Sequence, residues 1–226
     1  MIYAKSTCLL FLGVLAGVAD AAGPEVASLD RTVVRWAARS SDGHAQPHFI
    51  GARELAFESR IEGLSEGREL SRPYSDSHVR TAIQRHITEE ILAELPVDPP
   101  PAPKEVGRYA EGARIAIEQQ VGGRVALNLA ANLEGITAEE LNAMLRRRAR
   151  ASYYLDKVVA PMLQPSEAEL REVHRHGDTP FTGSPFVAVE DKVRNWYVSV
   201  RLRNALDSYY RSVRTKVSVE LIAWRR

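Results

Sequence analysis

Residues 32–38 read TVVRWAA, and this run near the N-terminus decides the fold together with TKVSVELIA at residues 215–223. The first run is rich in β-branched and aromatic residues, which is typical of a strand. The second alternates apolar and polar residues through Val217, Val219 and Leu221, as a strand with one buried face does. Because a lone strand is unstable by itself, we expect the two runs to pair and to close the chain between them into one domain.

Helical patterns dominate the region between these two runs. An apolar residue recurs every four positions from Val79 to Leu95, which predicts a helix over residues 77–95 with one apolar stripe. Further helices are expected over 52–64, 104–133 with an interruption near Gly122-Gly123, 137–162, 166–174 and 185–214. A second short strand is expected near 47–50. The predicted fold class is mainly α, a multi-helix module closed by a small β-sheet that pairs the N-terminal and C-terminal strands.

The first 21 residues have the pattern of a secretory signal peptide. Lys5 precedes an apolar run at residues 8–19 that is short for a membrane span, and Ala19-Asp20-Ala21 has the small-x-small pattern of a cleavage site. We expect cleavage before Ala22, with an uncleaved N-terminal anchor as the alternative. Cleavage would remove Cys8, the single cysteine, and leave residues 22–226 without a thiol for disulfides or metal binding.

The rest of the sequence argues against several classes of protein. The formal net charge is +1, from 30 Lys and Arg against 29 Asp and Glu, and this balance gives no support for nucleic-acid binding. No later apolar run reaches transmembrane length, so no transmembrane segment is expected after signal cleavage. The sequence contains no nucleotide-binding or nucleophile motif, and its histidines lack convincing ligand partners. We therefore expect no catalytic residue, no metal and no cofactor.

Two short segments have unusual composition. Residues 96–103 read PVDPPPAP and predict a stiff extended linker inside the domain, with a recognition motif for a proline-binding partner as the alternative. Residues 146–150 read RRRAR, and we interpret them as a solvated helix face. The minority interpretation of these arginines is a patch for an acidic client or an anionic membrane surface.

The order of these segments resembles the SurA-like periplasmic chaperones, which share a trigger-factor-like peptide-binding module. The likeness rests on the strand at 32–38 followed by GAREL at 51–55, on GITAEEL at 135–141, on QPSEAEL at 164–170, and on the long final helix with its closing strand. The resemblance implies that residues 22–226 form the SurA N-terminal type of helical chaperone domain, located in the periplasm. Relatives usually carry a parvulin-type prolyl isomerase domain of on the order of 100 residues. Only residues 175–185 stand at its place in this chain, so we expect that domain to be absent.

Aromatic pairs supply the candidate peptide-binding residues. Neighbouring rings on a helix point to different faces, so one ring of each pair can enter the core while the other faces a cleft or solvent. Tyrosine, tryptophan and methionine offer adaptable apolar contact to unfolded segments. The candidates for such a groove are Met144, Tyr153, Tyr154, Trp196, Tyr197 and Tyr209. Ordinary core packing with one surface ring per pair is the alternative.

These observations lead to three functional hypotheses. We favour an ATP-independent periplasmic holdase that binds unfolded exported proteins, including outer-membrane proteins. The resemblance also suggests a peptidyl-prolyl isomerase, which the missing domain argues against. A dedicated assembly factor with one stoichiometric partner is the third hypothesis, and a separate prolyl isomerase is a further candidate partner.

Overall fold

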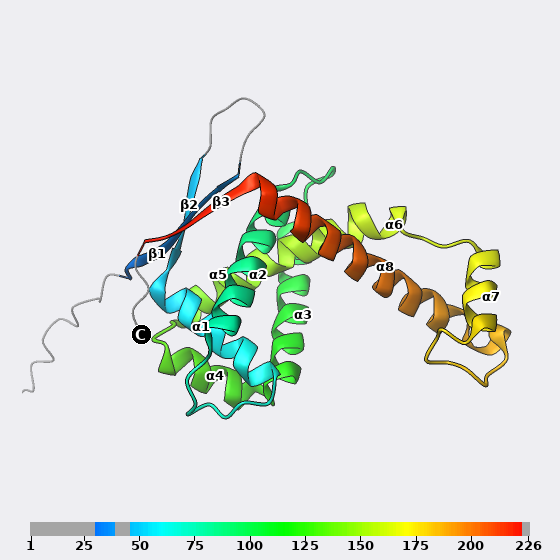
Figure 1. The fold of residues 1–226 in the computed structure, drawn as a ribbon, viewed down its shortest axis with the longest axis horizontal. Helices are drawn as coiled ribbons and strands as arrows, with labels where there is room; N and C mark the ends of the chain where they lie inside the picture. The colour runs from blue at the N-terminus through cyan, green and yellow to red at the C-terminus, as the bar shows by residue number, and fades with distance from the viewer. Residues whose placement is uncertain (1–29, 39–45, 223–226) are drawn as a thin grey trace, which may run out of the picture.

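The computed structural model describes residues 30–38 and 46–222 of the 226-residue chain. The expected signal peptide at residues 1–21 and its cleavage site lie outside the described residues. Figure 1 shows a small sheet joined to a helical body, and a long helix that runs from the sheet to a smaller helical unit at the far end of the molecule.

Three antiparallel strands form the sheet, in the order β2-β1-β3. They are β1 Thr32–Ala38, β2 Pro47–Gly51 and β3 Val217–Leu221. Trp36 of β1 lies opposite His48 of β2 on one side and Val219 of β3 on the other. The predicted pairing of the N-terminal and C-terminal strands is confirmed.

The helical body follows β2 directly and consists of five helices. They are α1 Ala52–Ser65, α2 Asp76–Glu94, α3 Pro103–Val121, α4 Arg124–Leu133 and α5 Ala138–Tyr154. The predicted helix over 104–133 is divided into α3 and α4 because Gly122 and Gly123 adopt φ values of 92° and 114°, which side chains other than glycine rarely tolerate. Thr137 begins α5 with a capping box, accepting from the Glu140 N–H while the Glu140 carboxylate accepts from the Thr137 N–H.

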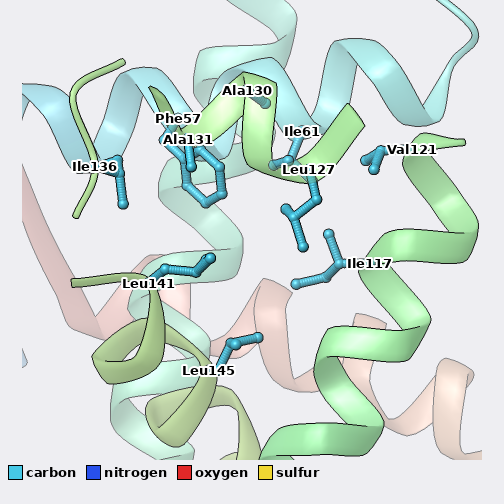
Figure 2. Close-up of a cluster of buried hydrophobic side chains, with 10 residues drawn as sticks. All are labelled: Phe57, Ile61, Ile117, Val121, Leu127, Ala130, Ala131, Ile136, Leu141 and Leu145. Carbon is cyan, nitrogen blue, oxygen red and sulfur yellow. The ribbon is translucent and has the colours of Figure 1, made fainter. Parts of the chain in front are cut away.

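Two apolar clusters hold this body together. In the first, side chains from α1, α3, α4 and α5 converge, with Leu127 and Ala130 of α4 completely buried among them (Figure 2). Its members are Phe57, Ile61, Ile117, Val121, Leu127, Ala130, Ala131, Ile136, Leu141 and Leu145. In the second cluster, the sheet packs on α1 and α2 through Val33, Val34, Trp36, Ile50, Leu55, Val79, Ala82 and Ile87.

The chain beyond α5 forms an extended arm. The predicted helix over 137–162 continues through a π-helical turn at Leu155–Val159 into α6 Ala160–Met162. A short helix, α7 Glu167–His176, packs on the long helix α8 Phe186–Lys216, where Leu170, Val189 and Val193 form a third, small cluster. Helix α8 then returns the chain to β3 (Figure 1). Over residues 30–38 and 46–222, no helix is long and apolar enough to cross a membrane.

Leu127 and Leu129 provide a matched test of the first cluster, because both lie on α4 but only one faces the interior. Leu127 is 0% exposed and Leu129 is 49% exposed. We expect Leu127→Ala to lower the free energy of unfolding by about 3 kcal/mol, through lost apolar burial and the cavity left behind. Leu129→Ala should lower it by less than ~1 kcal/mol. Chemical denaturation of both variants measures the difference, and equal losses would contradict the packing of α4 described here.

Candidate functional site

An open hollow lies where α2, α3 and α5 meet the proline-rich segment. Its volume is about 880 Å³. The lining residues are Ala93, Leu95, Pro96, Val97, Pro100, Pro101, Pro103, Val106, Gly107, Arg146, Arg150 and Tyr153. The segment at residues 96–103 connects α2 to α3, as a linker does, and it also forms one wall of this hollow, with α5 contributing to the lining.

One side of the hollow is apolar and poor in hydrogen-bond donors, whereas Arg146 and Arg150 lie on the α5 side. Four of its residues are prolines, whose rings offer apolar surface and whose nitrogens carry no hydrogen. Leu95, Val97 and Val106 add aliphatic surface beside them. A hollow of this size and composition can take several apolar side chains of a bound segment.

Tyr153 lies beneath the hollow in a fixed position. Its side chain is 5% exposed, and its ring meets that of Tyr109 edge-on at 5.4 Å between centroids. The Tyr109 hydroxyl donates a hydrogen bond to the Asp156 carboxylate. Burial and this neighbouring carboxylate raise the pKa of Tyr109 to about 12, so its hydroxyl stays protonated and keeps the contact well above neutral pH.

The arginine-rich run of α5 divides into two faces. Arg147 donates to Glu54 and Glu58 of α1, at 2.7 Å each, and Arg148 donates to Glu89 of α2 at 2.7 Å. Arg146 and Arg150 lie one turn apart on another face, line the hollow and are exposed. Within the described part of the chain neither of these two has an ion-pair or hydrogen-bond partner. The interpretation of the whole run as a solvated face is therefore wrong for Arg147 and Arg148, because acidic residues of α1 and α2 lie against them.

The contacts of Arg147 belong to a buried ionic network. Glu58 and His86 are only 4% and 2% exposed, and His86 Nδ1 lies 3.2 Å from the nearer Glu58 oxygen. Burial alone would raise the pKa of Glu58, but His86 and Arg147 outweigh it and lower this pKa to about 2. Burial opposes the charged form of His86 as well, yet the Glu58 carboxylate raises the pKa of His86 to about 9. Both groups are therefore charged at neutral pH.

This network has no room for a substrate. The cavity that touches Glu58, Arg85 and Glu89 has a volume of about 20 Å³, which is close to the space that one water molecule needs. We therefore assign the network a structural role. It fixes α5 on α1 and α2, and by doing so it sets the direction in which Arg146, Arg150 and Tyr153 point.

Among the residues that the structure describes, two groups of side chains have the composition of a metal site. In one, Glu54, Glu58 and His86 lie close together, but the Arg147 guanidinium contacts all three and takes the place that a cation would occupy. In the other, His48 Nδ1 lies 3.0 Å from Glu90 and 3.9 Å from Glu94, an ordinary histidine–carboxylate arrangement with the ring stacked on Trp36. We assign a metal to neither group.

The six residues predicted from the sequence do not come together in one groove. Met144 packs against the first apolar cluster, and Tyr153 lies at the hollow. Tyr154 lies near Tyr209 of α8. Burial raises the pKa of Tyr209, and the nearby Tyr154 raises it further. Trp196 and Tyr197 lie together on the arm, with ring centroids 6.3 Å apart.

Tyr197 is held within the arm. Its hydroxyl donates to Glu169 of α7 at 3.0 Å, and the Arg201 guanidinium lies over its ring at 4.9 Å. The ring also packs against the small cluster formed by α7 and α8. Tyr197 therefore contributes to the joint between α7 and α8.

Sequence reasoning missed the other walls of the hollow. Composition alone singles out the prolines at residues 96–103 and the arginines at residues 146–150, but it does not connect the two segments. A usable signal did exist, because Arg146, Arg150 and Tyr153 have the i, i+4, i+7 spacing that places residues on one helix face.

Comparison with known proteins finds no protein-family model, curated protein or solved structure that matches this chain. The function is therefore argued from the sequence patterns and from the geometry of the hollow.

Removing the negative charge of Glu58 tests the structural role of the network. We expect Glu58→Gln to lower the free energy of unfolding by about 2 kcal/mol, because Arg147 and His86 would stay buried with only Glu54 and Glu90 as counter-charges. The control is Glu139→Gln, since Glu139 is exposed at the start of α5 and has no ion-pair partner within the described ranges. Urea denaturation compares the two, and a loss below ~1 kcal/mol in Glu58→Gln would contradict the assigned role.

The network also predicts how stability depends on pH. The pKa of His86 is raised from 6.5 to about 9, so its contribution is complete below pH 6.5 and is lost as the pH rises through 9. The pKa of Glu58 is lowered from 4.5 to about 2, so its contribution is present above pH 4.5 and is lost as the pH falls through 2. NMR titration of the His86 ring measures the first value directly. A midpoint near 6.5 would show that Glu58 does not hold this proton.

Proposed function

We propose that this chain is an exported, ATP-independent chaperone that holds non-native polypeptide segments in the hollow beside the proline-rich segment. The observation that carries the proposal is the hollow itself. It is open, about 880 Å³ in volume, walled by prolines and aliphatic side chains, and supported by helices that buried contacts hold in place. An apolar surface of this kind fits weak, exchangeable binding of exposed apolar side chains.

The sequence patterns support the same proposal, which includes a location in the periplasm. The N-terminal 21 residues have the pattern of an export signal, and the order of elements resembles the peptide-binding module of the SurA-like chaperones. Helices α7 and α8 are joined only by residues 177–185, which leaves no room there for a parvulin-type domain of on the order of 100 residues. This connection is the observation that disfavours a prolyl isomerase of the family's usual type.

One observation favours the alternative of a dedicated assembly factor. The outer face of α4 carries Val125, Leu129 and Leu133 at four-residue spacing, and these side chains are 74%, 49% and 56% exposed. Such a regular apolar stripe suits one fixed protein partner better than many different clients. A single stoichiometric partner in a pull-down would support this alternative.

An aggregation assay tests the holdase proposal. A urea-unfolded outer-membrane β-barrel protein is diluted into buffer with the purified protein, and light scattering is followed without ATP. We expect suppression of aggregation at near-stoichiometric ratios, because the hollow would shield apolar segments of the client. No suppression would contradict general chaperoning and favour the assembly factor.

Two valine variants localise the activity in the same assay. Val106 lines the hollow, whereas Val187 of α8 is 81% exposed and lies outside it. We expect Val106→Ser to weaken client binding about fivefold, since it removes roughly 1 kcal/mol of apolar contact. Val187→Ser should leave client binding unchanged. Equal effects of the two substitutions would show that the hollow is not where clients bind.

A further inference from the structure

Arg146 and Arg150 give the hollow a preference for negatively charged groups, which its apolar wall does not supply. Arg147 and Arg148, which stand between them in the sequence, are already paired with carboxylates of α1 and α2. Arg146 and Arg150 line the hollow without a carboxylate within ion-pair distance, over residues 30–38 and 46–222. The lining of a largely apolar hollow therefore includes two uncompensated positive charges.

The spacing of these two arginines suits a carboxylate. They are four residues apart, so they are neighbours on one face of α5, about 6 Å apart at their Cβ atoms. A guanidinium presents a planar set of donors that matches the two oxygens of a carboxylate. Tyr153 lies one turn further along the same face but is almost completely buried, so the two arginines are the charged groups that α5 offers to the hollow.

The first turn of α3 adds little to this preference. Pro103 and Gly107 bring the N-terminus of α3 to the wall of the hollow, but Pro103 carries no N–H, and the Glu105 and Val106 N–H groups donate to the Ala102 carbonyl. The Glu105 carboxylate accepts from the Ala102 N–H and places a negative charge at this helix end. The helix end is therefore a minor contributor, and the two arginines carry the preference.

We propose that the hollow selects polypeptide segments in which an aspartate or glutamate side chain lies next to apolar residues, with Arg146 and Arg150 binding the carboxylate. The apolar neighbours of that side chain contact the proline-rich wall. This inference rests on the proposed function and names the class of segment that the hollow binds. We commit to side-chain carboxylates because a non-native client offers many internal segments but only one C-terminal carboxylate.

The test uses peptides that differ in one functional group. Two ten-residue peptides share an apolar, aromatic-flanked sequence, are blocked at both ends, and carry glutamate or glutamine at the centre. A third peptide has the central glutamine and a free C-terminal carboxylate. Isothermal titration calorimetry at low salt measures the affinity of the purified protein for each peptide.

We expect the glutamate peptide to bind about fivefold more tightly than the glutamine peptide, as a partly exposed ion pair can provide. The difference should disappear in the double variant Arg146→Gln and Arg150→Gln. It should persist in the control Arg80→Gln and Arg203→Gln, which changes the net charge equally through two exposed arginines outside the hollow. It should also shrink in high salt, which screens exposed charges.

Each other outcome has a separate meaning. Equal binding of the glutamate and glutamine peptides would overturn the carboxylate preference but leave apolar binding in the hollow intact. Tighter binding of the free C-terminal peptide alone would overturn the commitment to side chains. If the control variant lost the preference as well, general charge attraction would replace the specific site. If no peptide bound, the proposed function itself would fail.

Discussion

The contact on which the rest of the structure depends is that of Arg147 with Glu54 and Glu58. It joins α5 to α1, and His86 adds α2 to the same network. Burying an unpaired charge at this place would cost much free energy of folding. The observed position of α5 avoids that cost, because it sets Arg147 against these carboxylates. Helix α1 also contributes to both of the large apolar clusters. The ionic contact therefore fixes an arrangement that the apolar contacts stabilise.

Because the ionic contact fixes α5, it also determines which side chains of that helix line the hollow. With Arg147 and Arg148 directed to α1 and α2, the face that carries Arg146, Arg150 and Tyr153 meets the proline-rich segment. This segment cannot form a helix or pair in a sheet, because its prolines lack N–H groups and restrict the backbone. It forms an irregular connection between α2 and α3 instead, and lines the hollow together with α5. One helix thus connects the most buried charges of the molecule with its candidate binding surface.

The helices and strands could be predicted from the sequence because their causes are local. The four-residue repeat along α2, the glycines between α3 and α4, and the capping box at Thr137 act within a few residues. The aromatic residues show the limit of this reasoning. Tyr153 and Tyr154 point to different faces, as predicted, but the sequence could not show which ring meets the hollow and which meets α8.

By itself, the sequence determined the mainly helical class, the order of the elements and the pairing of the terminal strands. These follow from periodicity and from the instability of a lone strand. Only the tertiary structure decided the roles of the arginines at residues 146–150. Neighbouring guanidiniums are chemically identical, and their environment depends on carboxylates that lie 59 to 93 positions away along the chain. Long-range packing decides whether an arginine is buried in an ion pair or left free at a hollow. No local sequence pattern contains this information.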